Sequence, residues 1–386
     1  MAETNPNRRP SLAEIAFVFL KLGTIAFGGP AAHIAMMEEE FVLRRKWLSE
    51  TEFLDRLAAA NLIPGPSSTE LGIFVGHLKR GWRGLIVAGC CFIIPAALLV
   101  SLIAWAYVRF GALPQVESIL YAVKPVVAAI IVQALWKFAR TGVRTIFLGL
   151  VAAMAVIASL LGVSPILILL VAGCVSGAAF AAKSRLGNVP LVGLPKVLAV
   201  SASAVAAGVA IPVSLMRLFL SFLKIGSVVF GSGYVLLAFL RSEFVERLHW
   251  LTERQLIDAV AVGQFTPGPL FTTATFIGYI VAGWRGALVA TVGIFVPGFL
   301  LVALAGPLIP RIRRSPIVAA ALDAVVAASI ALMAVVTWQL GKAALVDRVT
   351  LAIFVVSVIA LLRFRVNSAV LVVVAGGLGW SLQALR

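Results

Sequence analysis

The sequence contains few charged residues, and few of those are acidic. Of its 386 residues, 12% are charged, 16 are Asp or Glu and 61% are hydrophobic. Soluble domains carry about 25% charged and about 45–50% apolar residues, so this composition excludes an ordinary soluble protein. Most of the chain must therefore face lipid.

Cysteine and histidine are also scarce, with three of each in the whole chain. Cys90, Cys91 and Cys174 all lie within apolar runs, and the histidines lack metal-ligand spacing. These features argue against a disulfide framework and a metal centre. We expect small core residues at the cysteine positions, and neither a metal nor a cofactor.

The sequence also lacks the common nucleotide-binding and hydrolytic motifs. It contains no G-x-x-x-x-G-K-[ST], no H-E-x-x-H and no G-x-S-x-G. The first absence excludes an ATP-driven pump within this chain, and the other two disfavour an intramembrane enzyme. A secondary carrier is the simpler hypothesis, a channel is an alternative, and an enzyme is the alternative from another class.

Basic residues are abundant but are grouped at the ends of apolar segments. The net charge of +16 therefore indicates membrane topology rather than nucleic-acid binding. Residues 1–10 are polar and include Arg8 and Arg9, with no small-residue cleavage site after them. We expect membrane lipid as the surroundings, no nucleic-acid partner, no removable signal peptide and a cytoplasmic N-terminus.

Apolar segments long enough to form membrane helices recur along the chain. Alternating strand patterns are missing, so we expect helices, which satisfy their own backbone in hydrocarbon. The predicted segments are 12–36, 53–78, 84–108, 117–137, 144–160, 163–181, 216–240, 255–281, 286–309, 317–340, 347–362 and 367–384. The sequence therefore predicts an all-α polytopic membrane protein.

The two halves of the chain repeat one another in step. The matched strings are F-L-K-L-G at 19–23 with F-L-K-I-G at 222–226, N-L-I-P-G-P at 61–66 with Q-F-T-P-G-P at 264–269, and G-W-R-G at 81–84 with G-W-R-G at 283–286. We expect a first repeat of about six helices or half-helices in 1–182, a linker with an extra span in 183–213, and a second repeat in 214–386. An odd extra span would invert the second repeat.

The distribution of basic residues supports this inversion, because they mark the cytoplasmic side. They follow the even-numbered segments of the first half and the odd-numbered segments of the second, as at Lys137, Arg140 and Arg144 against Arg311, Arg313 and Arg314. Inverted repeats are common in secondary transporters, with the substrate site where the repeats meet. Arg44, Arg45 and Lys46 go against the rule, so they belong to an interfacial helix or the first segment is re-entrant.

These motifs, taken in order and in duplicate, resemble the chromate ion transporter family in its long form with two fused homologous domains. The resemblance rests on Ala26–Pro30, Asn61–Thr69 and Gly81–Gly84, together with their second-half equivalents, and covers nearly the whole chain. It implies export of chromate from the cytoplasm, driven by the proton motive force, with sulfate as a related anion. Members outside the chromate-resistant group carry other substrates, so the substrate follows less directly than the fold.

The duplicated Pro-Gly-Pro string is the main candidate for the anion site. Helix breakers within an apolar region begin a new half-helix, whose N–H groups and positive dipole end attract anions. The alternative is a structural kink without a ligand. The candidate substrate-binding residues are Asn61, Pro64, Gly65, Pro66, Ser67, Ser68, Thr69, Gln264, Pro267, Gly268, Pro269, Thr272 and Thr273, with Gly28, Gly29 and Gly231 in the preceding glycine motifs.

Charged residues in or beside the apolar segments are further candidates. Lys21 and Lys224 lie inside equivalent first segments, where a cation is costly and usually functional; the alternative is that Lys21 snorkels to the surface. Glu40, Glu243 and Glu70 are candidates for proton coupling. The alternatives are solvated helix ends for the first two and, for Glu70, simple stabilisation of a helix N-terminus.

Together these observations predict a secondary transporter that exports chromate and confers chromate resistance. We expect a multi-pass protein of the bacterial inner membrane, driven by the membrane potential or proton motive force, and acting as a monomer or homodimer. A carrier or channel for sulfate or another oxyanion is the alternative.

Overall fold

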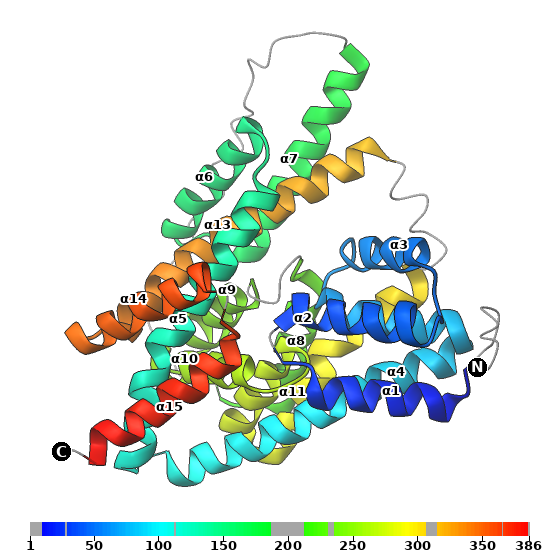
Figure 1. The fold of residues 1–386 in the computed structure, drawn as a ribbon. Helices are drawn as coiled ribbons and strands as arrows, with labels where there is room; N and C mark the ends of the chain where they lie inside the picture. The colour runs from blue at the N-terminus through cyan, green and yellow to red at the C-terminus, as the bar shows by residue number, and fades with distance from the viewer. Residues whose placement is uncertain are drawn as a thin grey trace.

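The computed structural model describes residues 10–27, 29–111, 113–186, 212–230, 235–305, 315–364 and 366–384. Regular secondary structure within these ranges is entirely helical (Figure 1). Five described helices are long and apolar enough to cross a membrane: Ser67–Phe110, Val116–Gly142, Pro165–Ala182, Leu270–Leu304 and Pro316–Ala344. The predicted all-α polytopic class is confirmed. The predicted extra span between the repeats falls largely outside the described residues.

The first repeat begins with helices that are separated by short breaks and ends with three continuous helices. Its elements are α1 (Leu12–Ile25), α2 (Gly29–Glu38), the π-helical turn η1 (Glu39–Arg44), α3 (Glu50–Ala60), α4 (Ser67–Phe110), α5 (Pro114–Gly142), α6 (Ile146–Leu160) and α7 (Pro165–Leu186). The interruption between α1 and α2 includes Ala26 and Phe27, within the Ala26–Pro30 string. A capping box between Ser49 and Glu52 starts α3, which explains why a hydroxyl residue stands at position 49.

The second repeat follows the same order. Its elements are α8 (Leu215–Val228), α9 (Leu236–Leu240), η2 (Arg241–Arg247), α10 (Glu253–Phe265), the 3₁₀ turn η3 (Leu270–Thr272), α11 (Thr273–Ala305), α13 (Pro316–Ala344), α14 (Arg348–Arg363) and α15 (Ser368–Ala384). Thr252 and Gln255 form the capping box that starts α10. The tandem repeat predicted from the sequence is therefore present in the fold.

Both α4 and α11 are hairpins of two helical limbs. The backbone leaves the helical region at Arg80 and Gly81 in α4, and at Ala282 and Gly283 in α11. The two glycines have φ of 56° and 60°, a left-handed conformation that glycine adopts without steric cost. The repeated Gly-Trp-Arg-Gly string therefore encodes the turn between the limbs.

The glycine of the repeated F-L-K-[LI]-G string sets a close helix crossing. A Cβ added to Gly23 would lie 2.5 Å from the carbonyl oxygen of Phe92, and one added to Gly226 would lie 2.3 Å from that of Ile294. Small residues allow such backbone approach between membrane helices, where packing rather than water drives association. The string thus holds α1 against α4 and α8 against α11.

The helices form two groups, and each group draws on both repeats (Figure 1). The core group combines α1–α4 with α8–α11, in which α4 packs against α1 and α11. The flanking group combines α5–α7 with α13–α15: α5 packs against α14 and α15, while its equivalent α13 packs against α6 and α7. Helices α9 and α10 supply close packing between the groups. The repeats are therefore interlocked rather than separate.

Candidate functional site

Each Pro-Gly-Pro string separates a short helix from a hairpin. Pro64-Gly65-Pro66 lies between α3 and α4, and Pro267-Gly268-Pro269 lies between α10 and η3. The last proline of each string has an extended backbone and caps the following helix. Proline suits this position because it has no N–H to leave unpaired. The predicted helix breaks are confirmed.

Each of the two breaks forms a backbone hydrogen bond with the opposite repeat. The Gly65 N–H donates to the carbonyl of Val229 at 2.7 Å, and the Gly268 N–H donates to the carbonyl of Ala26 at 3.0 Å. Val229 caps the C-terminus of α8, and Ala26 caps that of α1. Each break in one repeat thus meets the interrupted first helix of the other. Four helix ends therefore converge at the centre of the core group.

The N-terminus of α4 presents a buried polar turn at this crossing. Ser67, Ser68 and Thr69 are all buried, with 8%, 1% and 1% of the residue surface exposed. Among the described residues, the Thr69 hydroxyl has no hydrogen-bond partner. Because helix N-termini carry positive potential and free N–H groups, the first turn of α4 favours an anion.

Hydroxyl protons around the crossing are largely committed to protein acceptors. Since a carbonyl only accepts, His33 Nε2–H donates to Ala26 O at 3.0 Å, leaving Nδ1 to accept from Ser68 Oγ at 3.3 Å. In the second repeat, Thr272 and Thr273 donate to the carbonyls of Pro269 and Leu270, each at 2.8 Å. Among the described residues, the Thr69 hydroxyl thus remains as a donor without a protein acceptor.

The other predicted residues near the breaks differ between repeats. Asn61 is exposed, whereas its equivalent Gln264 is 7% exposed. Gly29 begins α2 with a φ of 77°. The predictions at Gly28 and Gly231 lie outside the described residues. The two sides of the crossing are thus similar in backbone but unequal in side chains.

Glu70 is the most unusual side chain at the crossing. It is 0% exposed, and neither carboxyl oxygen has a hydrogen-bond partner among the described residues. Its Oε1 lies 2.0 Å from the position that a Cβ on Gly65 would take, and 3.6 Å from the equivalent position on Gly298. The carboxyl group is therefore enclosed between the Pro-Gly-Pro turn of one repeat and the hairpin of the other.

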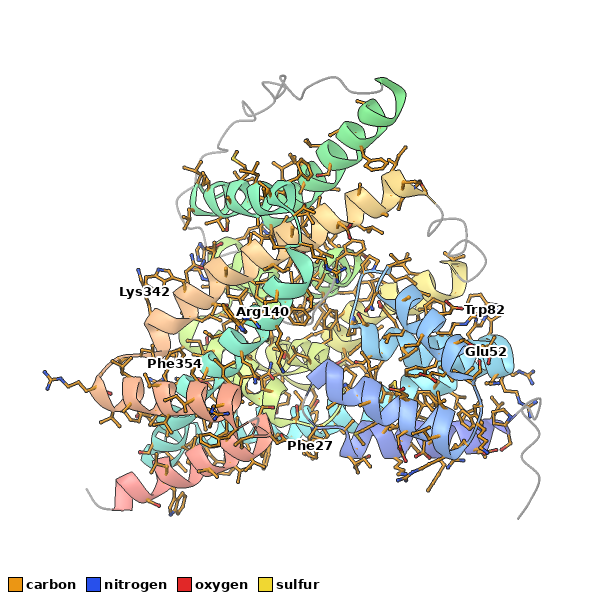
Figure 2. All side chains as sticks on the ribbon, turned by 45° about the horizontal axis from the view of Figure 1, so that its top comes forward. Phe27, Glu52, Trp82, Arg140, Lys342 and Phe354 are labelled. Atoms are coloured by element: carbon orange, nitrogen blue, oxygen red, sulfur yellow. The ribbon has the colours of Figure 1, made fainter. Side chains whose placement is uncertain are left out.

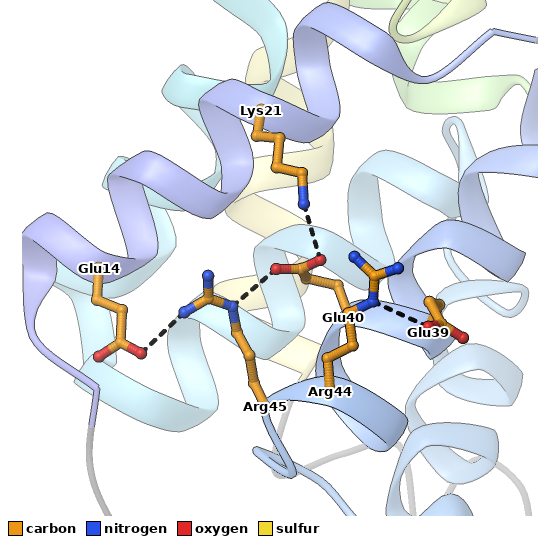
Figure 3. A network of polar contacts seen from close by, with 6 residues as sticks. All are labelled: Glu14, Lys21, Glu39, Glu40, Arg44 and Arg45. Carbon is orange, nitrogen blue, oxygen red and sulfur yellow. Dashed lines mark hydrogen bonds and ion pairs between the residues drawn. The ribbon is translucent and has the colours of Figure 1, made fainter.

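The two candidate lysines form equivalent ion pairs. Lys21 Nζ lies 3.2 Å from Glu40 Oε2 (Figure 3), and Lys224 Nζ lies 2.5 Å from Glu243 Oε2. The Glu40 carboxylate also accepts a hydrogen bond from Arg45, whose guanidinium lies 3.0 Å from the Glu14 carboxylate. The structure thus joins the predicted lysine and glutamate candidates into one polar cluster in each repeat.

These contacts determine the electrostatics of Glu40. Burial raises the pKa of the Glu40 carboxyl, but hydrogen bonds and charges from Arg45 and Lys21 outweigh burial and hold the pKa below its usual value of 4.5. The pKa of Glu243 is lowered in the same way: burial is offset by Arg247, Lys224 and Ser221. Both carboxylates are therefore charged at neutral pH.

A buried charged cluster joins the core and flanking groups, and the sequence did not predict it. Asp258 on α10 is 0% exposed and pairs with Lys124 of α5 at 3.1 Å. The Tyr107 hydroxyl of α4 donates to the same carboxylate at 2.9 Å. The equivalent Asp55 is exposed on α3. A lone lysine within the predicted 117–137 span was the available signal, because intramembrane cations are usually paired.

The turn of the α4 hairpin carries a basic cavity of about 470 Å³, lined by Leu12, His77, Leu78, Lys79, Arg80, Gly81 and Arg83. The equivalent turn of α11 has Val281 and Ala282 in place of Lys79 and Arg80. Figure 2 shows Trp82 at the edge of the molecule, next to this turn, and Phe27 nearer its middle. Positive charge therefore gathers at the end of the first hairpin.

The described residues hold no cluster of three or more metal-ligating side chains. Cys90, Cys91 and Cys174 are free thiols.

The family model described as chromate transporter matches residues 13–178 and 216–380. A chromate transport protein of Cupriavidus metallidurans is 33% identical over 95% of this chain and 92% of its own length. A probable chromate transport protein of Synechococcus elongatus is 33% identical over 91% and 89%. A chromate transport protein of Pseudomonas aeruginosa is 30% identical over 94% and 90%. No solved structure matches the chain. The two matched regions fall on the two interlocked helical repeats. The chain is a multi-pass membrane protein and belongs to the chromate transporter family.

Proposed function

We propose that this chain is a secondary carrier that exports chromate across the bacterial inner membrane and so confers chromate resistance. The observation that carries the proposal is the crossing of the two Pro-Gly-Pro breaks. There, helix ends of both repeats meet within the protein, and Gly65 and Gly268 each bond the opposite repeat. Names of the relatives support chromate as the anion.

The crossing has the properties that a tetrahedral oxyanion requires. Its oxygens accept hydrogen bonds, and the first turn of α4 supplies the positive end of the helix dipole and the Thr69 hydroxyl, without a fixed cationic side chain. Dipoles attract an anion more weakly than a full positive charge does, which suits a carrier that must release its substrate. Sulfate presents similar oxygens, so a sulfate or general oxyanion carrier is the second candidate.

The charge of the substrate supports export as the direction. Moving one charge through the membrane potential is worth about 2.3 kcal/mol per 100 mV, so a dianion leaving an inside-negative cell gains about twice that. The sequence places basic residues at the loops we assign to the cytoplasm, where they concentrate anions. A proton that crosses with the dianion lowers this gain to that of one charge, and the same inverted repeats make the two orientations of the site similar in energy.

The second repeat is proposed to run inverted relative to the first. The reciprocal Gly65 and Gly268 hydrogen bonds support a two-fold relation between repeats, and the shift of basic loops supports opposite orientations. Lys21 and Lys224, each held by its glutamate, are proposed to attract the anion at opposite ends of the path.

Chromate uptake into inside-out vesicles tests this function. Wild-type vesicles are expected to accumulate chromate, with sulfate added as competitor to rank the two anions. Gly65→Leu and Pro64→Ala are expected to abolish uptake while the protein still inserts. Gly341→Ala is the matched control, because a Cβ there meets no atom within 4 Å. Uptake by Gly65→Leu at the level of Gly341→Ala would reduce the break to a structural kink.

A further inference from the structure

Glu70 places a carboxyl group at the helix end that we assign to the anion. It occupies the first turn of α4, four residues after Pro66, with 0% of its surface exposed. Its oxygens approach Gly65 of the first break and Gly298 of the α11 hairpin. The side chain therefore folds back over the Pro-Gly-Pro turn instead of pointing away from it.

No charged group compensates Glu70 within the described structure. Both oxygens lack a hydrogen-bond donor among the described residues. On α2, His33 uses both ring nitrogens for Ala26 and Ser68. On α11, the repeat-equivalent residue is Thr273, whose hydroxyl donates to Leu270. On α1 and α8, the lysines are held by their own glutamates.

This isolation determines which form of the carboxyl group the site accommodates. Burying an unpaired carboxylate is far more costly than burying the neutral acid. The charge of an ionised Glu70 could be compensated only by the positive dipole end of the α4 N-terminus, which is also what the site offers to the substrate. Glu70 and a transported oxyanion therefore compete for the same positive end.

We infer that Glu70 is an internal occupant of the oxyanion site, and that a tetrahedral dianion binds there only together with a proton on Glu70. This inference rests on the proposed function. Where the pH is high enough to ionise Glu70, its carboxylate takes the dianion's place at the α4 N-terminus. When the dianion enters, one proton from solution binds the carboxylate, and the neutral acid remains beside Gly65 and Gly298.

Proton and anion then cross the membrane in the same direction. One proton accompanies each dianion, so each turnover moves one net negative charge and voltage still drives export. The second repeat has Thr273 at the equivalent position, so it cannot titrate. The proton is therefore bound by Glu70, on the first-repeat side of the two-fold crossing.

Anion binding to the purified protein in detergent tests the inference without relying on transport. The probes are sulfate, which stays a dianion across neutral pH, and chromate. For wild type, the dissociation constant for sulfate should rise about tenfold per pH unit once Glu70 ionises, because one proton is linked to binding. Binding in weakly buffered solution should take up about one proton per sulfate.

The Glu70→Gln variant mimics the neutral acid. It is expected to bind sulfate as tightly at high pH as wild type does at low pH, and to take up no proton. Glu50→Gln is the control, because Glu50 is exposed on α3; it should keep the wild-type pH dependence. Thermal unfolding of Glu70→Gln verifies that it folds, and Glu70→Asp should retain a pH-dependent affinity.

Three results would overturn the inference. One is wild-type sulfate affinity that does not change with pH, and another is unchanged pH dependence in Glu70→Gln. The third is loss of binding in folded Glu70→Gln, because a neutral isostere should free the site. A wild-type protein that binds neither sulfate nor chromate at any pH contradicts the proposed function itself, and the inference with it.

Discussion

Replacing Gly268 with alanine should both destabilise the protein and stop transport. Gly268 has a φ of 90°, and an added Cβ would lie 2.6 Å from Ala96 Cβ and 3.3 Å from the Gly23 carbonyl. Neither neighbour has a flexible side chain that can move aside. Backbone strain costs about 1–3 kcal/mol, and overpacking costs about 1–3 kcal/mol more. We expect a total of about 2–6 kcal/mol.

Gly283→Ala is the matched control for this prediction. Its φ is 60°, and an added Cβ meets no atom within 4 Å. It should therefore incur only the left-handed strain of about 1–2 kcal/mol. The difference between the two variants isolates the clash at the crossing.

Thermal unfolding in detergent and chromate uptake in vesicles are the two assays. We expect Gly268→Ala to melt well below Gly283→Ala. Its uptake should fall about 100-fold or more, because a site displaced by about 1 Å loses that much activity. The reasoning would be refuted if the two variants matched in both melting temperature and uptake, since the crossing would then tolerate displacement.

Three other predictions follow from the charged clusters and the repeat. Lys124→Met should destabilise the protein by about 3–5 kcal/mol, because it leaves Asp258 as a buried unpaired charge, whereas Lys124→Met with Asp258→Leu should recover most of that loss on thermal unfolding. Because the pKa of Glu40 is lower in the folded state, its contribution to stability is present above pH 4.5 and is lost as the pH falls below that value. The melting temperature of Glu40→Gln should therefore fall less at acid pH than that of the wild type. Reporter tags in the 137–144 and 311–314 loops should both be cytoplasmic, and periplasmic labelling of either loop contradicts the inverted arrangement.

The sequence was sufficient to predict the backbone features of the fold. Glycine and proline act locally, so the strings at 64–66 and 267–269 predict breaks wherever they occur. The hairpin turns at Gly81 and Gly283 lie at the repeated Gly-Trp-Arg-Gly strings for the same reason. Apolar length predicted the five long helices, because the bilayer sets it. Four of the predicted segments, 12–36, 53–78, 216–240 and 255–281, are instead each divided between separate helices.

Pairing between distant residues was not predictable from the same patterns. Lys124 and Asp258 are 134 positions apart and come from different repeats, so no local period relates them. The crosswise bonds of Gly65 and Gly268 use backbone atoms, which leave no trace in residue identity. Their existence follows only from the interlocking of the repeats.

Voltage-driven chromate uptake tests the central claim most directly. Inside-out vesicles would be given a lumen-positive potential of about 100 mV with no pH gradient. If one proton accompanies each dianion, the net charge yields about 2.3 kcal/mol, a roughly fifty-fold accumulation. Wild-type vesicles should reach accumulation of this order, and Gly65→Leu vesicles should show none. Uptake that ignores voltage and follows the pH gradient alone, or that persists in Gly65→Leu, would contradict electrogenic export through the crossing of the two breaks.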